Sequence, residues 1–199
     1  MQRIRNVQKE LLSDNWYKLE KVQYEFLLAN GNWENHTREA YDRGNGSTIL
    51  LYNLKKKSVL LTRQFRLPTY LNGNETGFLI ETCAGLLDDR NPEECIRKEA
   101  EEETGYHLHK VEKVFESYMS PGSVTEILYF FIAEYDEKMK MSQGGGVLEE
   151  QEEIEVMELP FDEAFDMIRR GTIRDGKTIM LLQHLKISGM MTTSGSSLR

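Results

Sequence analysis

The chain has few of the residues that build cross-linked or membrane proteins. Two of its 199 residues are cysteines. Cys83 lies in an apolar run and Cys95 in a helical segment, which predicts reduced core thiols and no disulfide framework. None of the four histidines has the spacing with cysteine that a zinc site needs. No stretch is apolar over the length of a signal sequence or a membrane span, so we expect a cytoplasmic protein without a membrane partner.

Basic residues are also in deficit. The sequence has 25 lysines and arginines against 33 aspartates and glutamates, a net charge of -8 and a pI of about 5.2. Binding to a DNA or RNA backbone needs clustered positive charge, so we expect no nucleic-acid partner. Because an acidic protein repels polyanions, a phosphate-bearing substrate would have to be held by local cations and a metal ion.

The most informative segment, residues 84–105, contains a capped helix. Asn91 followed by Pro92 has the form of an N-cap and a first helical residue. Gly105 is the residue expected just past a helix C-terminus. The sequence therefore predicts a helix over 92–104.

This helix carries acidic residues at close spacing. At about 100° per residue, Glu99, Glu102 and Glu103 share one face, while Glu101 points to the opposite side. Like charges at these spacings repel one another, and a bound cation would compensate. Hard oxygen ligands suit Mg²⁺ or Mn²⁺. The alternative is a solvated acidic face, which is the usual reason for such a run.

Changes of periodicity along the chain predict a layered fold. Partial alternation in 17–28 and again in 37–41, around a turn rich in Asn and Gly, predicts a β-hairpin before the main domain. Apolar runs and helical periods then predict an α/β fold with a mixed sheet (α+β), an α/β/α sandwich. The expected strands are 48–52, 58–65, 78–83, 111–118 and 126–135, and the expected helices are 92–104, 161–170 and 176–185.

Composition divides the chain into three parts. We predict an N-terminal β extension at 1–45, a main domain at 46–190 and a disordered polar tail at 191–199. Within the main domain, residues 136–153 run from glycines to glutamates and predict a flexible acidic loop.

The frame around the acidic helix resembles the Nudix box of the Nudix hydrolases. That pattern is Gly, five residues, Glu, seven residues, Arg-Glu, an apolar residue, any residue, Glu-Glu, any residue, Gly and an apolar residue. Three features depart from it: the spacing from Gly85 to Glu99 is one residue shorter, lysine replaces the arginine, and Arg90 or Asn91 stands where the early glutamate belongs. That glutamate is not usually a primary metal ligand, so the metal site is expected to be intact. The matching positions are Gly85, Lys98-Glu99-Ala100, Glu102-Glu103 and Gly105-Tyr106.

Further segments narrow the resemblance to the nucleoside-diphosphate-sugar branch. Residues 118–126 contain its Ser-Pro-Gly-x-x-x-Glu segment, which as structure predicts a Pro-Gly turn between strands. Residues 41–46, 63–66, 73–75 and 173–178 resemble the subgroup that hydrolyses GDP-mannose. The resemblance implies Mg²⁺-dependent cleavage of GDP-mannose to GMP and mannose 1-phosphate. The alternatives are cleavage of ADP-ribose to AMP and ribose 5-phosphate, and a silent Nudix fold that binds a nucleotide without cleaving it.

Metal and catalytic roles follow from the acidic face and from the resemblance. Glu99 and Glu103 are the expected metal ligands, with Glu102 as a further ligand or as the residue that orients water. The resemblance adds the backbone carbonyl of Ala84. In this branch a glutamate on a mobile loop often acts as general base, and Glu152 is the candidate, both as base and as metal ligand. The open alternatives are Glu149, Glu150 and Glu153.

Two cations and one acid are candidates for contacts with the diphosphate and the sugar. Arg66 and Lys177 would hold the diphosphate, since a guanidinium fork and an ammonium group are natural phosphate partners. Glu126 would accept a sugar hydroxyl. For Arg66 the alternative is an ordinary surface arginine.

Three residues near the N-terminus are further candidates for contacts with the substrate. Trp16 stands where the subgroup carries a ring that stacks on the base, although such a ring is as often a packing residue. The resemblance also implies a swapped homodimer, in which Arg38 and Glu39 would reach the neighbouring subunit's site.

Overall fold

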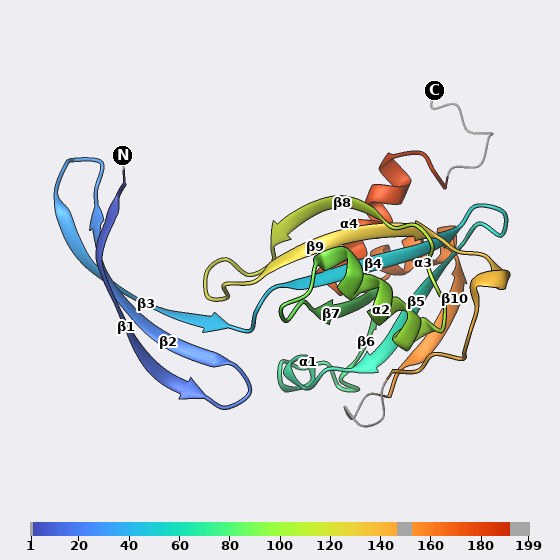
Figure 1. Cartoon of the computed structure of the whole chain (residues 1–199), viewed down its shortest axis with the longest axis horizontal. Helices are drawn as coiled ribbons and strands as arrows, with labels where there is room; N and C mark the ends of the chain where they lie inside the picture. Colours follow the sequence, from blue (N-terminus) through green and yellow to red (C-terminus); the bar gives the residue numbers. More distant parts are fainter. Residues whose placement is uncertain (1, 147–152, 192–199) are drawn as a thin grey trace. The chain divides into compact units, whose positions relative to one another are not determined.

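The structure is a computed structural model and describes residues 2–146 and 153–191. The chain forms two compact units (Figure 1). Met1–Asn45 and Ser117–Leu128 make up the N-terminal unit, and Gly46–Glu116 and Tyr129–Arg199 make up the sandwich unit. The glutamates at 147–152 and the tail at 192–199, for which we predicted a flexible loop and disorder, lie outside the described residues.

The N-terminal unit is built on a three-stranded antiparallel sheet. The predicted hairpin is formed by β2 (Lys18–Leu27) and β3 (Trp33–Asp42), and β1 (Ile4–Asp14) adds a strand on the other side of β2. The sequence did not predict β1, because its pairing register shifts around Asn6, whose φ is 54°. No residue of these three described strands is fully buried.

The loop at 119–126 extends this sheet. Beyond the predicted Pro121-Gly122 turn, the Tyr41 amide donates a hydrogen bond to the Ser123 carbonyl (2.7 Å), and the Thr125 amide donates to the Tyr41 carbonyl (3.1 Å). The two bonds make a parallel bridge to β3. The Ser-Pro-Gly segment is therefore part of the same unit as the N-terminal strands.

The sandwich unit is centred on a seven-stranded mixed sheet. Its strand order is β10-β5-β4-β9-β8, with β6 paired to β5 and β7 paired to β4. The strands are β4 Gly46–Asn53, β5 Ser58–Phe65, β6 Phe78–Glu81, β7 Cys83–Leu86, β8 Glu112–Tyr118, β9 Ile127–Glu134 and β10 Glu155–Pro160.

One predicted strand, 78–83, forms two strands in the structure. Up to Glu81 the chain pairs with β5, and from Cys83 it pairs with β4, so that Thr82 lies at the crossover. An apolar run does not reveal this change of partner, because the partners are distant in sequence. The edge strand β10 was not predicted either, since it is only half-buried and is held by its pairing with β5.

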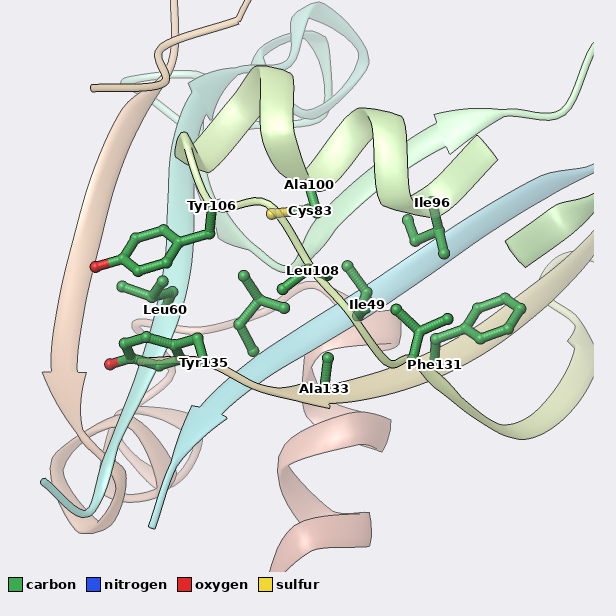
Figure 2. Packing of buried hydrophobic residues seen from close by; sticks show 12 residues of the cluster. Ile49, Leu60, Cys83, Ile96, Ala100, Tyr106, Leu108, Phe131, Ala133 and Tyr135 are labelled. Atoms are coloured by element: carbon green, nitrogen blue, oxygen red, sulfur yellow. The ribbon is translucent and has the colours of Figure 1, made fainter. Parts of the chain in front are cut away.

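Helices cover both faces of the sheet, which confirms the predicted α/β/α sandwich. Helix α2 (Pro92–Thr104) lies against β7 and β4 on one side, and α4 (Gly176–Ile187) lies on the other side (Figure 2). Helix α3 (Phe161–Arg169) packs on α4, β5 and β10. The structure adds a short α1 (Leu67–Leu71) and a 3₁₀ turn, η1 (Glu137–Met139), that were not predicted. No helix in the described ranges is long and apolar enough to cross a membrane.

The main hydrophobic core lies between α2 and the sheet (Figure 2). Ile49 of β4 and the α2 residues Ile96 and Ala100 are completely buried, and burying one large apolar side chain stabilises a fold by about 1.5–3 kcal/mol. The rings of Tyr106 and Tyr135 meet edge to face with their centroids 5.1 Å apart. This core holds α2, and with it the acidic face, against β7. The other members are Leu51, Leu60, Cys83, Leu108, Val111, Phe131 and Ala133.

Candidate active site

Caps fix the two ends of α2 and so the direction in which its acidic residues point. The Asn91 side chain accepts a hydrogen bond from the Glu93 amide (2.9 Å), as the sequence predicted. Gly105 ends the helix in the left-handed conformation, with a φ of 80°. A methyl group on Gly105 would also collide with the backbone carbonyl of Ser142. Glycine is therefore required here both by the turn and by the neighbouring segment.

The start of the predicted acidic loop is bound to the end of α2. The amide of Gly145 donates to the Glu103 carbonyl (2.9 Å), and the amide of Gly146 donates to the Glu102 carbonyl (3.2 Å). Carbonyl groups at a helix end lack partners within the helix, and these two amides satisfy them. In its described part the predicted flexible loop is thus tied to the helix that carries the candidate metal ligands.

Two glutamates of α2 contact the residues on either side of Ala84 in β7. A methyl group on Gly85 would come within 2.5 Å of Cγ of Glu99, so the Glu99 side chain lies directly over this glycine. One turn later, Glu103 is 2% exposed and hydrogen-bonds with the thiol of Cys83, which lies beneath α2 (Figure 2). Burial first, and then the charge of Glu103, raise the pKa of that thiol. Cys83 is therefore a protonated core residue, as predicted.

This arrangement fits a hard divalent cation. The carboxylates of Glu99 and Glu103 are one helical turn apart, and the residues that they contact flank Ala84. Carboxylate and backbone carbonyl oxygens are donors of the kind that Mg²⁺ and Mn²⁺ prefer. Mg²⁺ commonly takes one or two carboxylates and completes its shell with water and phosphate oxygens. Over residues 2–146 and 153–191, no three side chains of His, Cys, Asp or Glu form a metal cluster. The third predicted carboxylate, Glu152, lies outside the described residues.

The other two acids of the run have different surroundings. Glu102 pairs with Lys98 (2.8 Å), and both side chains are partly exposed. Exposed pairs of this spacing contribute about 0.3–0.5 kcal/mol, so Glu102 can leave its partner at little cost to orient water or to join a metal shell. Glu101 is turned toward solvent and pairs with His107 (2.7 Å).

Arg66 and Lys177 meet on a carboxylate that the sequence analysis did not single out. Glu81, 3% exposed, accepts from Nε of Arg66 through Oε2 (2.8 Å) and from Nζ of Lys177 through Oε1 (2.5 Å). The three residues belong to three elements: Arg66 follows β5, Glu81 ends β6, and Lys177 lies in the first turn of α4. Burial alone would raise the pKa of Glu81, but the charges of Lys177 and Arg66 outweigh burial and hold the pKa below its ordinary value.

Asp175 extends this cluster into the start of α4. One of its oxygens accepts from the Thr178 amide (3.0 Å) and caps the helix, and the other lies 3.0 Å from Nζ of Lys177. The Thr178 hydroxyl in turn accepts from the amide of Thr82 (2.8 Å), at the crossover just before β7. Burial lowers the pKa of Lys177, but the neighbouring carboxylates raise it by more, so the net shift is upward and the lysine is charged at neutral pH.

In the N-terminal unit, Trp16 and Glu126 are joined through two intermediate residues. Trp16 is 83% exposed and meets Tyr17 edge to face, with 6.4 Å between ring centroids. The Arg43 guanidinium lies over Tyr17 (5.5 Å to the ring centroid) and 3.6 Å from the Glu126 carboxylate. At this exposure Trp16 is not part of a core within the chain, and its ring is free to stack on a ligand.

The same unit contains a groove of about 520 Å³ that includes Arg38 and Glu39. Both residues lie on β3, and the loop at 119–126 supplies the facing wall. In this groove two of the predicted substrate-binding residues lie beside the Ser-Pro-Gly segment. The remaining lining residues are Val22, Tyr24, Ala40, Tyr118, Pro121, Gly122, Ser123, Val124 and Thr125.

Sequence reasoning missed Glu81, Asp175 and Arg43. For Glu81 a signal exists, because an acid inside an apolar run becomes a buried charge that must be paired. For Asp175 the signal is its position directly before a helix, where aspartate is a preferred cap. Arg43 lies in the segment 41–46 that resembles the subgroup, but its contact with Glu126 depends on how the loop at 119–126 docks on β3.

Comparison with known proteins identifies the class to which this fold and its acidic helix belong. The family described as NUDIX domain matches residues 42–182, and the family described as GDP-mannose pyrophosphatase NudK N-terminal domain matches residues 3–41. The chain belongs to the Nudix hydrolase family, as the acidic helix predicted. Nudix hydrolases generally use divalent metal cations.

The chain is similar over most of its length to several curated proteins. A GDP-mannose pyrophosphatase of Pectobacterium atrosepticum is 61% identical over 183 residues, which are 92% of this chain and 94% of that protein. GDP-mannose pyrophosphatases of Shigella flexneri and Escherichia coli are 57% identical over 190 residues, 96% of this chain and 98% of theirs. The crystal structure of an ADP compounds hydrolase matches 96% of this chain and 98% of its own, with a TM-score of 0.71 and 18% identity, and shows the fold alone.

Proposed function

We propose that this chain is a Mg²⁺-dependent hydrolase that cleaves the pyrophosphate bond of GDP-mannose, giving GMP and mannose 1-phosphate. The observation that supports the chemistry is the contact of Glu99 with Gly85 and of Glu103 with Cys83, the two residues on either side of Ala84. The substrate is proposed from the relatives at 57–61% identity, which bear the name GDP-mannose pyrophosphatase.

The metal ligands in this proposal are Glu99, Glu103 and the carbonyl of Ala84, joined by Glu152. A bound Mg²⁺ would neutralise charge on the diphosphate oxygens and lower the pKa of a coordinated water. Glu102, released from Lys98, orients the attacking water. Glu152 takes the proton from that water as general base, and its segment starts from the glycines that are bound to the end of α2.

The substrate-binding roles in this proposal are those predicted from the sequence. Arg66 and Lys177 hold the diphosphate, and their shared contact with Glu81 supports a joint role. Glu126 accepts a sugar hydroxyl, and Arg43 holds its carboxylate in place. Trp16 stacks on the base.

We also propose that the protein is a cytoplasmic homodimer. In this proposal residues 1–45 act as a dimerisation arm and residues 46–190 form the Nudix domain. Arg38 and Glu39 would reach the partner's site across the interface. The exposed apolar side chains of β1 support this, because Val7 is 53% and Leu11 56% exposed. Three strands without a buried face need a partner surface for stability.

The experiment that tests the function compares wild type with Glu103→Gln and with Glu101→Gln. Each protein is incubated with GDP-mannose, ADP-ribose or ADP-glucose at equal concentration, with and without Mg²⁺, and the products are identified by chromatography. Glu101→Gln is the matched control, because it removes the same charge from the same helix on the face turned toward solvent.

We expect wild type and Glu101→Gln to release GMP fastest from GDP-mannose, and only with Mg²⁺, while Glu103→Gln is inactive. If AMP is released from ADP-ribose faster than GMP from GDP-mannose, the proposed metal chemistry stands and the proposed substrate is wrong. Nucleotide-sugar binding without turnover by any of the proteins would show a silent binding module. Equal activity of the two variants would overturn the metal site on α2.

A further inference from the structure

We infer that Glu81 is a positioning residue for the diphosphate, which orients Arg66 and Lys177 together and cancels one of their two positive charges. The inference rests on the proposed function, because it takes these two cations as diphosphate ligands. It adds a residue that itself has no contact with the reacting atoms. Glu81 is suited to this role because it is almost fully buried and has a separate carboxylate oxygen for each cation.

The contact with Arg66 fixes the guanidinium and leaves its outer nitrogens available. Glu81 uses only Nε of Arg66 (2.8 Å), and the two terminal nitrogens make no hydrogen bond with any residue in the described ranges. The Arg66 side chain is 40% exposed. The two terminal nitrogens are the pair that binds a phosphate in a fork. Glu81 thus fixes Nε of Arg66 and leaves the two terminal nitrogens available for a phosphate.

Lys177 is held more tightly. Its side chain is 12% exposed, and Nζ lies 2.5 Å from Glu81 and 3.0 Å from Asp175. A lysine alone is a flexible point charge with several rotatable bonds. Glu81 and Asp175 together restrict the position of the Lys177 ammonium group. Because Glu81 also binds Arg66, it fixes the position of this ammonium group relative to the Arg66 guanidinium. The spacing between the two cations is therefore set by a single side chain.

The positive and negative charges in the cluster of Arg66, Lys177, Glu81 and Asp175 are equal in number. Arg66 and Lys177 carry two positive charges, and Glu81 and Asp175 carry two negative charges, so the group as a whole is neutral. A neutral group gives a diphosphate directed hydrogen bonds without a strong net attraction in the ground state. Glu81→Gln would add one net positive charge and release the fork. We expect tighter or unchanged ground-state binding together with slower turnover.

The competing explanation is that Glu81 is a structural ion-pair residue that only joins β6 to α4. Buried ion pairs of that kind are common, and removing one partner is destabilising. A structural role would lower the amount of folded protein and leave the properties of each folded molecule unchanged. A positioning role would change kcat without raising KM, and it would act through Arg66.

The test is a double-mutant cycle with Glu81→Gln, Arg66→Ala and the combined variant. Initial rates with GDP-mannose and Mg²⁺ give kcat and KM, and thermal unfolding gives the folded fraction. Displacement of the residue that holds a reacting group commonly costs about 10–100-fold, and this is the expected fall in kcat for Glu81→Gln, with KM unchanged or lower. In the Arg66→Ala background the same change should lower kcat by a smaller factor than in wild type, because only the contact of Glu81 with Lys177 remains to be lost.

A matched control is Glu158→Gln. Glu158 is also a carboxylate held by several donors, since it accepts from Ser58 (2.9 Å) and Tyr135 (2.9 Å) and pairs with Lys56 (3.1 Å). It belongs to β10 and to none of the proposed substrate contacts. We expect this control to lower stability while kcat and KM per folded molecule stay at the wild-type values. If Glu81→Gln is not folded, Glu81→Asp keeps the charge, shortens the side chain and enters the same cycle.

A second measurement separates this inference from the proposed function. The same cycle is run on the Kd for inorganic pyrophosphate with Mg²⁺, which needs no turnover of GDP-mannose. If the effects of the two substitutions on this Kd are coupled but wild type does not cleave GDP-mannose, the inference stands and the proposed function is wrong. Two results would overturn the inference alone, provided that wild type cleaves GDP-mannose. In the first, Glu81→Gln has the same effect with Arg66 and with alanine at that position. In the second, Glu81→Gln behaves like Glu158→Gln and lowers stability without changing kcat or KM per folded molecule.

Discussion

Replacing Gly85 by alanine should damage the metal site while leaving the fold intact. The added methyl group would lie 2.5 Å from Cγ of Glu99, and ordinary carbon–carbon contacts are about 3.5 Å or longer. Glu99 must therefore retreat by about 1 Å. Metal sites tolerate ligand displacements of only about 0.2 Å, and a misplacement of about 1 Å in a catalytic arrangement commonly costs about 100-fold. We expect kcat/KM to fall by about that factor.

The stability of this variant should change little. The backbone of Gly85 is not in the left-handed region, so alanine adopts its conformation without strain. The obstructing atoms belong to a side chain that can rotate away, and changes of this kind usually shift the free energy of unfolding by less than about 1 kcal/mol. Loss of rate should therefore appear without loss of folded protein.

The assay measures initial rates with GDP-mannose over a range of Mg²⁺ concentrations, together with thermal unfolding in the absence of metal. For Gly85→Ala we expect an apparent Mg²⁺ constant at least about tenfold higher, because one ligand is displaced. Gly171→Ala gives the opposite pattern: its φ of 71° disfavours alanine, at a cost of about 1–2 kcal/mol, and its rates should be normal. Wild-type rates and Mg²⁺ dependence in Gly85→Ala would refute the assignment of Glu99 as a ligand.

Three further predictions concern stability. The pKa of Glu81 lies below its ordinary value of 4.5 in the folded protein, so its ion pairs stabilise fully above that pH and are lost as the pH falls through the lower folded pKa. Glu81→Gln should therefore flatten the acid side of a plot of Tm against pH, and an unchanged slope would contradict this. Asn91→Ala should cost about 1 kcal/mol in urea unfolding by removing the cap of α2, with Asn91→Ser close to wild type. Tyr135→Phe removes a buried hydroxyl that bonds to Ser58 (2.7 Å) and Glu158 (2.9 Å), at a cost of about 1–3 kcal/mol, and unchanged urea unfolding would show that these bonds contribute nothing.

The parts of the structure that depend on local sequence were predicted well. Helix α2 begins and ends at the predicted residues because its signals, Asn91 and Gly105, act within one turn of the helix ends. The strand Ser58–Phe65 was also predicted at its observed bounds. In both cases the residues that decide the element are contained in it or adjacent to it.

The parts that depend on distant partners were not predicted. The crossover at Thr82 exists because β4 and β5 offer separate edges to one apolar run. The cluster around Glu81 joins residues 15 and 96 positions away, and no pattern in the sequence links those positions. The acidic face of α2 was visible in the sequence, but the neighbours that receive it, Cys83 and Gly85, became evident only from the packing of α2 on β7.

The exposed three-stranded sheet of the N-terminal unit would make the activity of this enzyme depend on protein concentration, if the proposed dimer forms. Every residue of β4 is buried, whereas none in β1, β2 or β3 is fully buried. If a second copy covers that sheet, association and folding of the arm are one equilibrium, and mass action sets the folded fraction. Specific activity should then decline on dilution, and Tm should rise with concentration.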